Sequence, residues 1–160
     1  MIGLLRAFFR TQTPAIADAR ATDAAALADV HARAFRHGWS ESEFERLLAD
    51  PLVTCHVARL GRTIAGFVLS RLVEDEAEIL MVAVEPSSQG RGFGKSLLAR
   101  HLGRLAARGA RRVFLEVDEG NAPAIRLYTH AGFVQVGRRP GYYASREGAA
   151  AALILRRDLV

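Results

Sequence analysis

A glycine-rich turn between a strand-like run and an amphipathic helix is the feature of this sequence that most restricts its fold. The turn is Gln89-Gly90-Arg91-Gly92-Phe93-Gly94, and the apolar run 79–84 precedes it. Apolar residues then recur at helical spacing, at Leu97, Leu98, Leu102 and Leu105. Successive backbone N–H groups in such a turn, together with the helix dipole, form a site for phosphate oxygens. The sequence therefore predicts a strand, an anion-binding turn and a helix in succession.

Two well-known phosphate-binding motifs do not fit this turn. A Walker A loop needs G-x-x-x-x-G-K-[ST], but Gln89 stands where its first glycine belongs. The dinucleotide motif G-x-G-x-x-G fails because its last glycine would fall on Lys95 or Leu97. The remaining pattern is Q-x-x-G-x-G, which a purely structural glycine turn before a helix would satisfy equally well.

The segment before the turn predicts one strand, two helices and a three-stranded meander. The first helix begins at Thr22 or Asp23 and reaches Phe35, and the second begins after Ser40, whose capping box with Glu43 marks a helix start. Pro51 stops that second helix. Strands are expected at 15–19, 52–60, 63–73 and 77–84, with Gly61-Arg62 as a tight hairpin turn between two of them.

After the turn, the pattern predicts a helix over 94–108 that Gly109 ends, a strand over 112–117, and a helix over 122–131 that Asn121 caps. Strands near 133–136 and 151–157 close the chain. The element order is β-α-α-β-β-β-α-β-α-β-β, an α/β fold with a mixed, largely antiparallel sheet flanked by helices. With 160 residues, half of them hydrophobic, we expect one domain over 14–160 after a short extension, 1–13.

The charge balance favours anionic ligands. The chain has 22 Lys and Arg against 17 Asp and Glu, a formal charge of +5, and its arginines are scattered. A nucleic-acid module usually shows a basic stripe with interleaved aromatic residues. The densest basic cluster here lies instead beside strand-like segments, at Arg138, Arg139, Arg156 and Arg157. Direct binding to nucleic acid is therefore not expected.

The lone Cys55 has no partner for an intrachain disulfide, which fits a reducing compartment, and its strand-like surroundings indicate a buried residue rather than a nucleophile. No metal site is expected, because the five histidines lack metal-ligand spacing. The apolar N-terminal stretch is broken by Arg6, and no run approaches the length of a membrane span. We expect no membrane association and a cytoplasmic location.

Two blocks of the chain resemble the GNAT superfamily of N-acetyltransferases. The first is Val82-Ala83-Val84-Glu85-Pro86 followed by the Q-x-x-G-x-G turn. The second has the superfamily's spacing and consists of Leu115-Glu116-Val117, Asn121, Ala122, Ala124, Leu127-Tyr128 and Ala131-Gly132-Phe133. Further similarity to the bacterial ribosomal-protein-alanine N-acetyltransferase branch comes from Phe35, Trp39-Ser40-Glu41, Phe44 and Tyr142-Tyr143. The resemblance covers about residues 14–158.

This resemblance implies acetyl-coenzyme A as the cosubstrate, held where two central strands diverge after Val84. The backbone of Val82, Ala83 and Val84 would bind the pantetheine arm and polarise the thioester. The pyrophosphate would lie on the turn, whose expected contacts are Gln89, Gly90, Arg91, Gly92, Phe93, Gly94 and Lys95. Asn121 would also contact the cosubstrate.

The resemblance also implies that Glu116 is the general base and Tyr128 the general acid of a direct acetyl transfer. Each residue has a structural alternative: Glu116 as an outward-facing strand residue, Tyr128 as a core aromatic of its helix, and Asn121 as an N-cap, a role compatible with binding. Trp39 and Tyr142-Tyr143 would either pack or flank the acceptor groove.

The implied acceptor is the N-terminal α-amine of a protein, with a ribosomal protein as the leading candidate. A small-molecule amine or a lysine is the alternative within enzymes. A non-catalytic binding module of the same fold is the alternative outside them, and the presence of both Glu116 and Tyr128 argues against it. Two positions depart from the branch: Asp118 stands where an Arg is frequent, and Ala149-Ala150 where an acidic pair is frequent. Asp118 and Glu119 are expected to attract a basic peptide instead.

Overall fold

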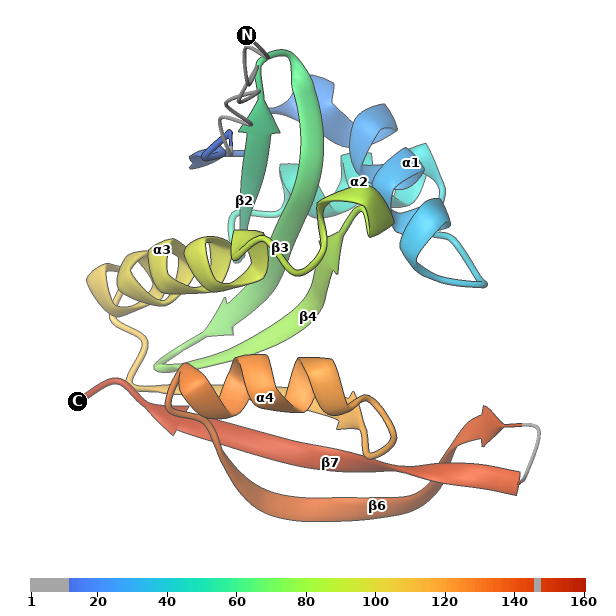
Figure 1. The fold of residues 1–160 in the computed structure, drawn as a ribbon. Helices are drawn as coiled ribbons and strands as arrows, with labels where there is room; N and C mark the ends of the chain where they lie inside the picture. The colour runs from blue at the N-terminus through green and yellow to red at the C-terminus, as the bar shows by residue number, and fades with distance from the viewer. Residues whose placement is uncertain (1–11, 146–147) are drawn as a thin grey trace, which may run out of the picture.

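The computed structural model describes residues 12–145 and 148–160, and the side chains of 142–149 lie outside that description. The described chain forms one seven-stranded sheet with helices on both faces (Figure 1). The strands lie in the order β1-β2-β3-β4-β5-β7-β6. The expected α/β fold with a mixed, largely antiparallel sheet is confirmed.

The elements follow the expected order. The first half contains β1 (Ala15–Asp18), the 3-10 turn η1 (Ala21–Asp23), α1 (Ala24–Ala34), α2 (Glu41–Ala49), β2 (Val53–Leu60), β3 (Thr63–Val73) and β4 (Glu76–Val84). The second half contains the 3-10 turn η2 (Pro86–Ser88), α3 (Phe93–Ala107), β5 (Arg112–Asp118), α4 (Ala122–His130), β6 (Val134–Ser145) and β7 (Gly148–Asp158).

Local signals set several of these boundaries as predicted. The Ser40–Glu43 capping box is present, since the Glu43 N–H donates to Ser40 Oγ and the Ser40 N–H donates to Glu43 Oε2. Leu60 pairs with Thr63, and Gly61 has a φ of 60°, as a tight turn at Gly61-Arg62 requires. The hairpin prediction is therefore confirmed.

The last two strands are longer than predicted. We expected strands near 133–136 and 151–157. Instead β6 continues through Gly137, Pro140 and Gly141, with register shifts between Gln135 and Gly137 and between Arg139 and Tyr143. Since β6 is the edge of the sheet, a proline and irregular pairing are tolerated there.

The sheet opens between β4 and β5. These parallel strands pair only where Glu76, Ala77 and Glu78 face Arg112, Val113 and Phe114. We expected the divergence after Val84, but it begins after Glu78, so most of β4 faces the opening. Figure 1 shows α3 along β2 and β3 and α4 along β5 and β7, so that one helix lies on each side of the opening.

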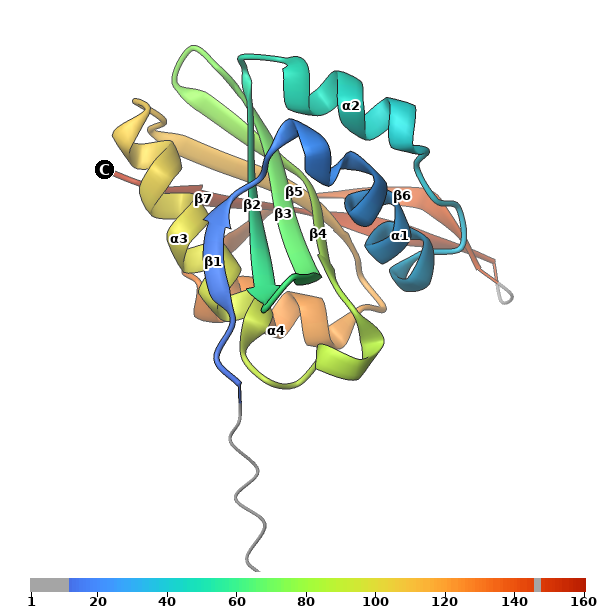
Figure 2. The same ribbon diagram turned by 90° about the horizontal axis from the view of Figure 1, so that it is seen from above.

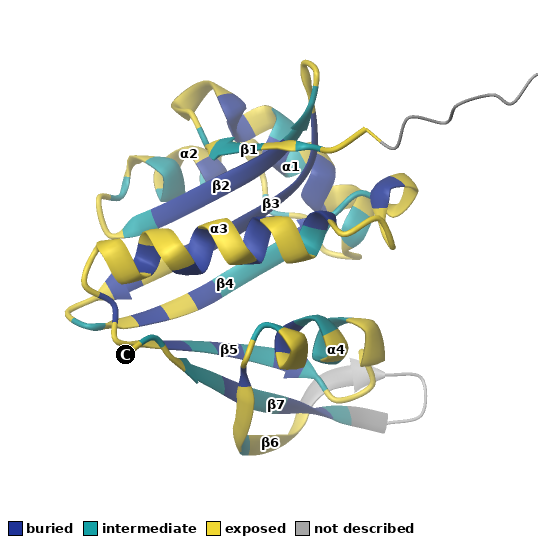
Figure 3. Cartoon of the chain, turned by 60° about the vertical axis from the view of Figure 1, so that its left-hand side comes forward, coloured by how far each residue is buried: buried dark blue, intermediate teal, exposed yellow. Residues whose placement is uncertain are grey.

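Two hydrophobic clusters fill the two sides of the sheet. Residues of α1 and α2 such as Leu27 and Phe44 pack with Phe67 of β3, while α3 and α4 pack against the other face through Leu97 and Tyr128. Figure 2 shows α1 and α2 on the opposite side of the sheet from α3. Both faces of β2 and β3 are therefore covered, and these strands are almost entirely buried (Figure 3).

A chain of polar side chains crosses this core beneath α3. Ser70 Oγ lies 2.7 Å from His101 Nε2, His101 Nδ1 lies 2.8 Å from His56 Nδ1, and His56 Nε2 lies 3.1 Å from Asp18 Oδ1. Ser70, His56 and His101 are fully buried. A carboxylate only accepts, so it favours a proton on His56 Nε2. His56 Nδ1 then accepts from His101 Nδ1, and His101 Nε2 accepts from the Ser70 hydroxyl, so both rings are neutral. These contacts fix α3 to β2 and β3.

The first prediction concerns stability against pH. Burial lowers the pKa of His101 to about 3, with a smaller contribution from His56, and burial also lowers the pKa of His56 despite the nearby Asp18. The unfolded chain takes up these protons near pH 6.5, before the folded chain does, so stability is complete above about pH 6.5 and is lost as the pH falls. Urea unfolding from pH 8 to 4 should show a loss below pH 6.5 that approaches about 1.4 kcal/mol per pH unit from His101, with a further loss from His56.

The matched variants are His101→Gln and His37→Gln. His101→Gln should lower the free energy of unfolding at pH 8, because Ser70 and His56 lose a partner. It should also reduce the slope of that free energy against pH. The second changes an exposed histidine and should keep the wild-type slope. An unchanged slope in His101→Gln would contradict the assignment of a neutral buried ring.

Candidate active site

The glycine turn has the backbone geometry that its sequence predicts. Gly90 and Gly92 have φ values of 72° and 82°, a region that side chains disfavour, and Gly92 immediately precedes α3. Gln89 Nε2 donates to the carbonyl of Val84 at 3.0 Å, which ties the turn to the end of β4.

The N-terminus of α3 presents backbone donors. Among the described residues no side chain caps this end, and the first intrahelical bond runs from the Ser96 N–H to the carbonyl of Gly92 at 3.1 Å. The N–H groups of Phe93, Gly94 and Lys95 therefore precede the helical pattern, where a helix binds anions. The Phe93 ring is buried in the core and carries Arg91 over its face at 5.1 Å, so Phe93 offers only its backbone.

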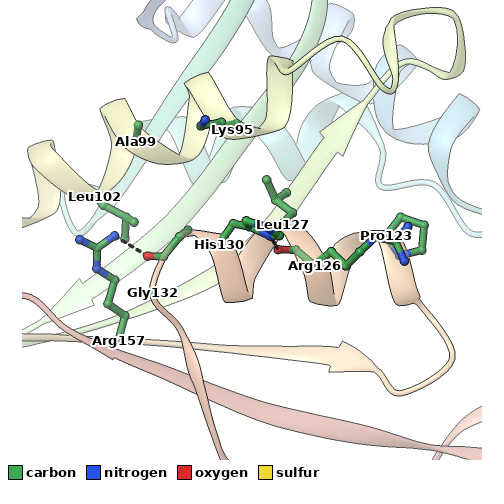
Figure 4. Close-up of a pocket in the computed structure, with 10 residues that line it drawn as sticks. Lys95, Ala99, Leu102, Pro123, Arg126, Leu127, His130, Gly132 and Arg157 are labelled. Atoms are coloured by element: carbon green, nitrogen blue, oxygen red, sulfur yellow. Dashed lines mark hydrogen bonds between the residues drawn. The ribbon is translucent and has the colours of Figure 1, made fainter.

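A cavity of about 640 Å³ lies beside this N-terminus, between α3 and α4 (Figure 4). Its walls are apolar at Ala99, Leu102 and Leu127. Its basic lining residues are Lys95, Arg126, His130 and Arg157. Arg157 Nη1 donates to the carbonyl of Ala131 at 2.5 Å, and His130 Nδ1 lies 2.7 Å from the carbonyl of Arg126. Apolar walls with cations at the rim fit an anion that also has an apolar part. The sequence patterns did not reveal this cavity, because it depends on how the two helices pack.

A second cavity, of about 450 Å³, occupies the opening between β4 and β5. It brings together four of the predicted site residues: Val82, Glu116, Asn121 and Tyr128. Ala83 turns its side chain into the cluster of α1 and α2, so only its backbone is available to a ligand. The opening thus collects residues from β4, β5 and α4 that lie far apart in the sequence.

Glu116 points into this cavity from β5, where its carboxylate meets an arginine. Its side chain is 24% exposed, and Oε1 lies 2.9 Å from Nη2 of Arg139 on β6. The alternative of an outward-facing strand residue is therefore not what the structure shows. In the sequence, Arg139 stands out only as part of a basic cluster, and no pattern links it to Glu116.

Tyr128 and Asn121 each combine a structural role with a place in the cavity. Tyr128 is 8% exposed and packs edge-on against Phe133 at 5.9 Å between ring centroids. Asn121 Oδ1 accepts from the Ala124 N–H at 3.2 Å, which confirms the predicted N-cap of α4. The packing and site interpretations of both residues are therefore compatible.

The two acidic residues at the end of β5, Asp118 and Glu119, are already engaged. Asp118 lines the cavity, and its Oδ1 accepts from the Gly120 N–H at 2.7 Å. Glu119 accepts two hydrogen bonds from Arg138, both at 3.0 Å, and these bonds hold the pKa of its carboxyl below the usual range. The expectation that these acids attract a basic peptide therefore has no support at Glu119, whose charge Arg138 matches.

Of the aromatic residues that would either pack or flank the acceptor groove, Trp39 has packing contacts. Trp39 stacks on His31 at 5.3 Å and lies 5.7 Å from Phe44, so it packs against α1 and α2. Phe35, at the end of α1, lines the Glu116 cavity instead. The backbone of Tyr142-Tyr143 lies in β6, but these side chains fall outside the description.

Cys55 is buried, and burial raises the pKa of its thiol to about 12, as expected for a core residue rather than a nucleophile. Across residues 12–145 and 148–160, no three side chains of the metal-ligating types form a group. No helix in the same ranges combines the length and the apolar character needed to cross a membrane.

Comparison with known proteins agrees with this geometry. The model of the Acetyltransferase (GNAT) family matches residues 24–133. The chain is 32% identical to the [ribosomal protein bS18]-alanine N-acetyltransferase of Escherichia coli K12 over 140 residues, which is 88% of this chain and 94% of that protein. It is 38% identical to the N-alpha-acetyltransferase RimI of Mycobacterium tuberculosis over 142 residues, 85% of this chain and 87% of that one.

Solved structures show the same fold. The crystal structure of the Escherichia coli ribosomal-protein-S18-alanine N-acetyltransferase superposes with a TM-score of 0.84 at 30% identity, over 91% of this chain and 93% of that one. Arabidopsis thaliana NAA60 in complex with acetyl-CoA superposes with a TM-score of 0.81 at 20% identity, over 92% and 99% of the two chains. With its family match, its relatives and its fold in agreement, this chain belongs to the GNAT family of acetyltransferases, as an acetyl-coenzyme A-dependent N-acetyltransferase.

Proposed function

We propose that this protein acetylates the N-terminal α-amine of a protein, with a ribosomal protein that begins with alanine as the leading acceptor. The observation that carries the proposal is the cavity between β4 and β5, where Glu116 and Tyr128 line one space. The relatives named for ribosomal-protein-alanine and N-alpha acetylation support this choice of acceptor. A binding module without turnover would not need these two groups in one cavity.

The described residues fit acetyl-coenzyme A along one continuous path. The N–H groups of Gly92, Phe93, Gly94 and Lys95 would bind the pyrophosphate at the start of α3. The cavity between α3 and α4 would take the nucleotide end, because Lys95, Arg126 and Arg157 supply positive charge beside apolar walls. The backbone of Val82 to Val84 and the side chain of Asn121 would direct the thioester into the opening beside Glu116.

The bound thioester supplies an acetyl group whose carbonyl carbon the amine nitrogen attacks. Glu116 takes the proton that the attacking nitrogen releases, directly or through water. The C–N bond forms as the C–S bond breaks, and the Tyr128 hydroxyl donates a proton to the departing sulfur. A backbone N–H of β4 directed at the carbonyl oxygen would stabilise its developing charge, a contribution of about 10²- to 10³-fold in rate.

An α-amine suits this cavity better than a lysine. An α-amine with a pKa near 8 is neutral in roughly a tenth of molecules at pH 7, whereas a lysine near 10.4 is neutral in well under one in a thousand. At about 1.36 kcal/mol per pKa unit, deprotonating the lysine ammonium costs about 3 kcal/mol more than deprotonating the α-amine. The cavity holds the carboxylates Glu116 and Asp118, and both already have partners, so no strong additional base is available among its lining residues.

We further propose that 14–160 form the catalytic domain, that 1–13 are an extension, and that the protein works in the cytoplasm. The family match within 24–133 supports the domain. A ribosomal acceptor would place the enzyme where ribosomes are made. Residues 1–11 lie outside the described part of the chain.

The second prediction tests the turn. Acetyl-coenzyme A should raise the melting temperature of the wild type, by the equivalent of about 2.7 kcal/mol at a hundredfold excess over Kd. Gly92→Val should abolish this rise, because valine does not adopt the φ of 82° that directs the N–H groups. The control is Gly103→Ala, in the same helix with open space around it, which should keep the rise. A folded Gly92→Val protein that binds normally by calorimetry would refute the turn assignment.

The third prediction tests the catalytic pair. Glu116→Gln and Tyr128→Phe should each lower kcat by roughly 10²- to 10⁴-fold, as expected for a general base and a general acid, with acetyl-coenzyme A affinity unchanged. Glu119→Gln is the matched control, because that carboxylate binds Arg138 and does not line the cavity. Near-wild-type turnover in Glu116→Gln, measured by thiol release, would remove Glu116 from the mechanism.

The fourth prediction tests the acceptor. Two peptides begin with alanine and contain one internal lysine, and they differ only in a free or a blocked α-amine. We expect thiol release with the free peptide and at least about 100-fold less with the blocked one, because the lysine is rarely neutral. Equal turnover of the blocked peptide would reassign the enzyme to lysine or small-amine acetylation.

A further inference from the structure

We propose that Arg139 is a positioning residue for Glu116, whose carboxylate it holds in the cavity. This inference rests on the proposed function, in which Glu116 is the general base. It concerns a residue that the two family blocks of the sequence do not contain.

Arg139 reaches Glu116 across an intervening strand. Glu116 lies on β5 and Arg139 on β6, and β7 runs between them. Glu116 pairs with Ile154 on β7, and Arg139 pairs with Ala152, two residues away, so all four share one face of the sheet.

The backbone around Arg139 is set by its neighbours. Pro140 follows it, which fixes its own φ and restricts Arg139 to an extended conformation. The register shift of β6 begins at the same point, between Arg139 and Tyr143. Arg139 therefore stands at the last regular pair before the irregularity in β6.

The neighbouring Arg138 provides an internal comparison. It is also about half exposed and also binds a carboxylate, but its partner is Glu119, which does not line the cavity. Two consecutive arginines thus form two similar ion pairs, and only the pair of Arg139 includes a cavity residue. Partly exposed pairs of this kind contribute little to folding stability, so removing either one should leave the protein folded.

The Arg139 guanidinium is a rigid planar group that lies 2.9 Å from Glu116 Oε1, so it favours one position of the carboxylate. The contact also restricts the rotamers of Glu116, so the carboxylate does not have to be ordered in each turnover.

The test compares Arg139→Gln and Arg139→Lys with the matched control Arg138→Gln. Arg139→Gln should lower kcat for an N-terminal peptide about tenfold, while the KM values for peptide and acetyl-coenzyme A do not rise. Arg139→Lys should recover part of this loss, since it keeps the charge without the planar guanidinium. Arg138→Gln should remain within about twofold of wild type. Melting temperatures establish that each variant is folded. If Arg139→Gln does not fold, the kcat of Arg139→Lys tests the proposal instead.

A double-mutant cycle separates this inference from the proposed function. In a Glu116→Gln background, Arg139→Gln should cause no further loss, because the carboxylate through which it acts is gone. Wild-type turnover in Glu116→Gln alone would overturn the proposed base. If Glu116→Gln turns over slowly but Arg139→Gln loses no more activity than Arg138→Gln, the role of Arg139 is overturned. The assignment of Glu116 as the base then stands. The same loss from Arg139→Gln in both backgrounds would show that Arg139 acts independently of Glu116, which also overturns the inference.

Discussion

The short parallel pairing of β4 with β5 is the constraint on which the rest of the molecule depends. Only Glu76 to Glu78 and Arg112 to Phe114 pair, and beyond them the two strands diverge inside the sheet. Backbone groups along such an opening need partners, because unpaired polar groups away from water are costly. An elongated ligand with amide groups along its length would provide them. The opening therefore leaves backbone groups without strand partners and at the same time offers them to a ligand. The helices that follow β4 and β5 lie on its two sides.

The opening is held in place by the packing around it. On one side Ser70, His56 and His101 fix α3 to the meander, and on the other Tyr128 and Phe133 pack α4 against the last three strands. A single hydrophobic cluster includes both helices and the start of β5, so the two sides meet where the strands still pair. The geometry of the cavity thus follows from packing that is complete without a ligand, which lowers the ordering cost of binding.

Local sequence signals were enough to predict the element order, the glycine turn, the Ser40 capping box and the Asn121 cap, because neighbouring residues determine each of them. Features that depend on distant residues were not predictable in the same way. The extent of β6 depends on its edge position, which tolerates Pro140, and the role of Gln89 depends on where the carbonyl of Val84 points. The Arg139–Glu116 pair depends on two register values across β7, which no spacing in the sequence encodes.

Charge is divided between the two ends of the site. Beside the acceptor end, Glu116 and Glu119 are matched one to one by Arg139 and Arg138, so these pairs add little net charge. At the cosubstrate end, Lys95, Arg126 and Arg157 surround one cavity that has no acidic residue in its lining. Cations thus gather at the cavity where a polyphosphate would bind, while at the acceptor end two carboxylates are paired with arginines and Asp118 accepts from the Gly120 N–H. An anionic cosubstrate and a cationic amine would therefore meet oppositely charged groups at their own ends of the site.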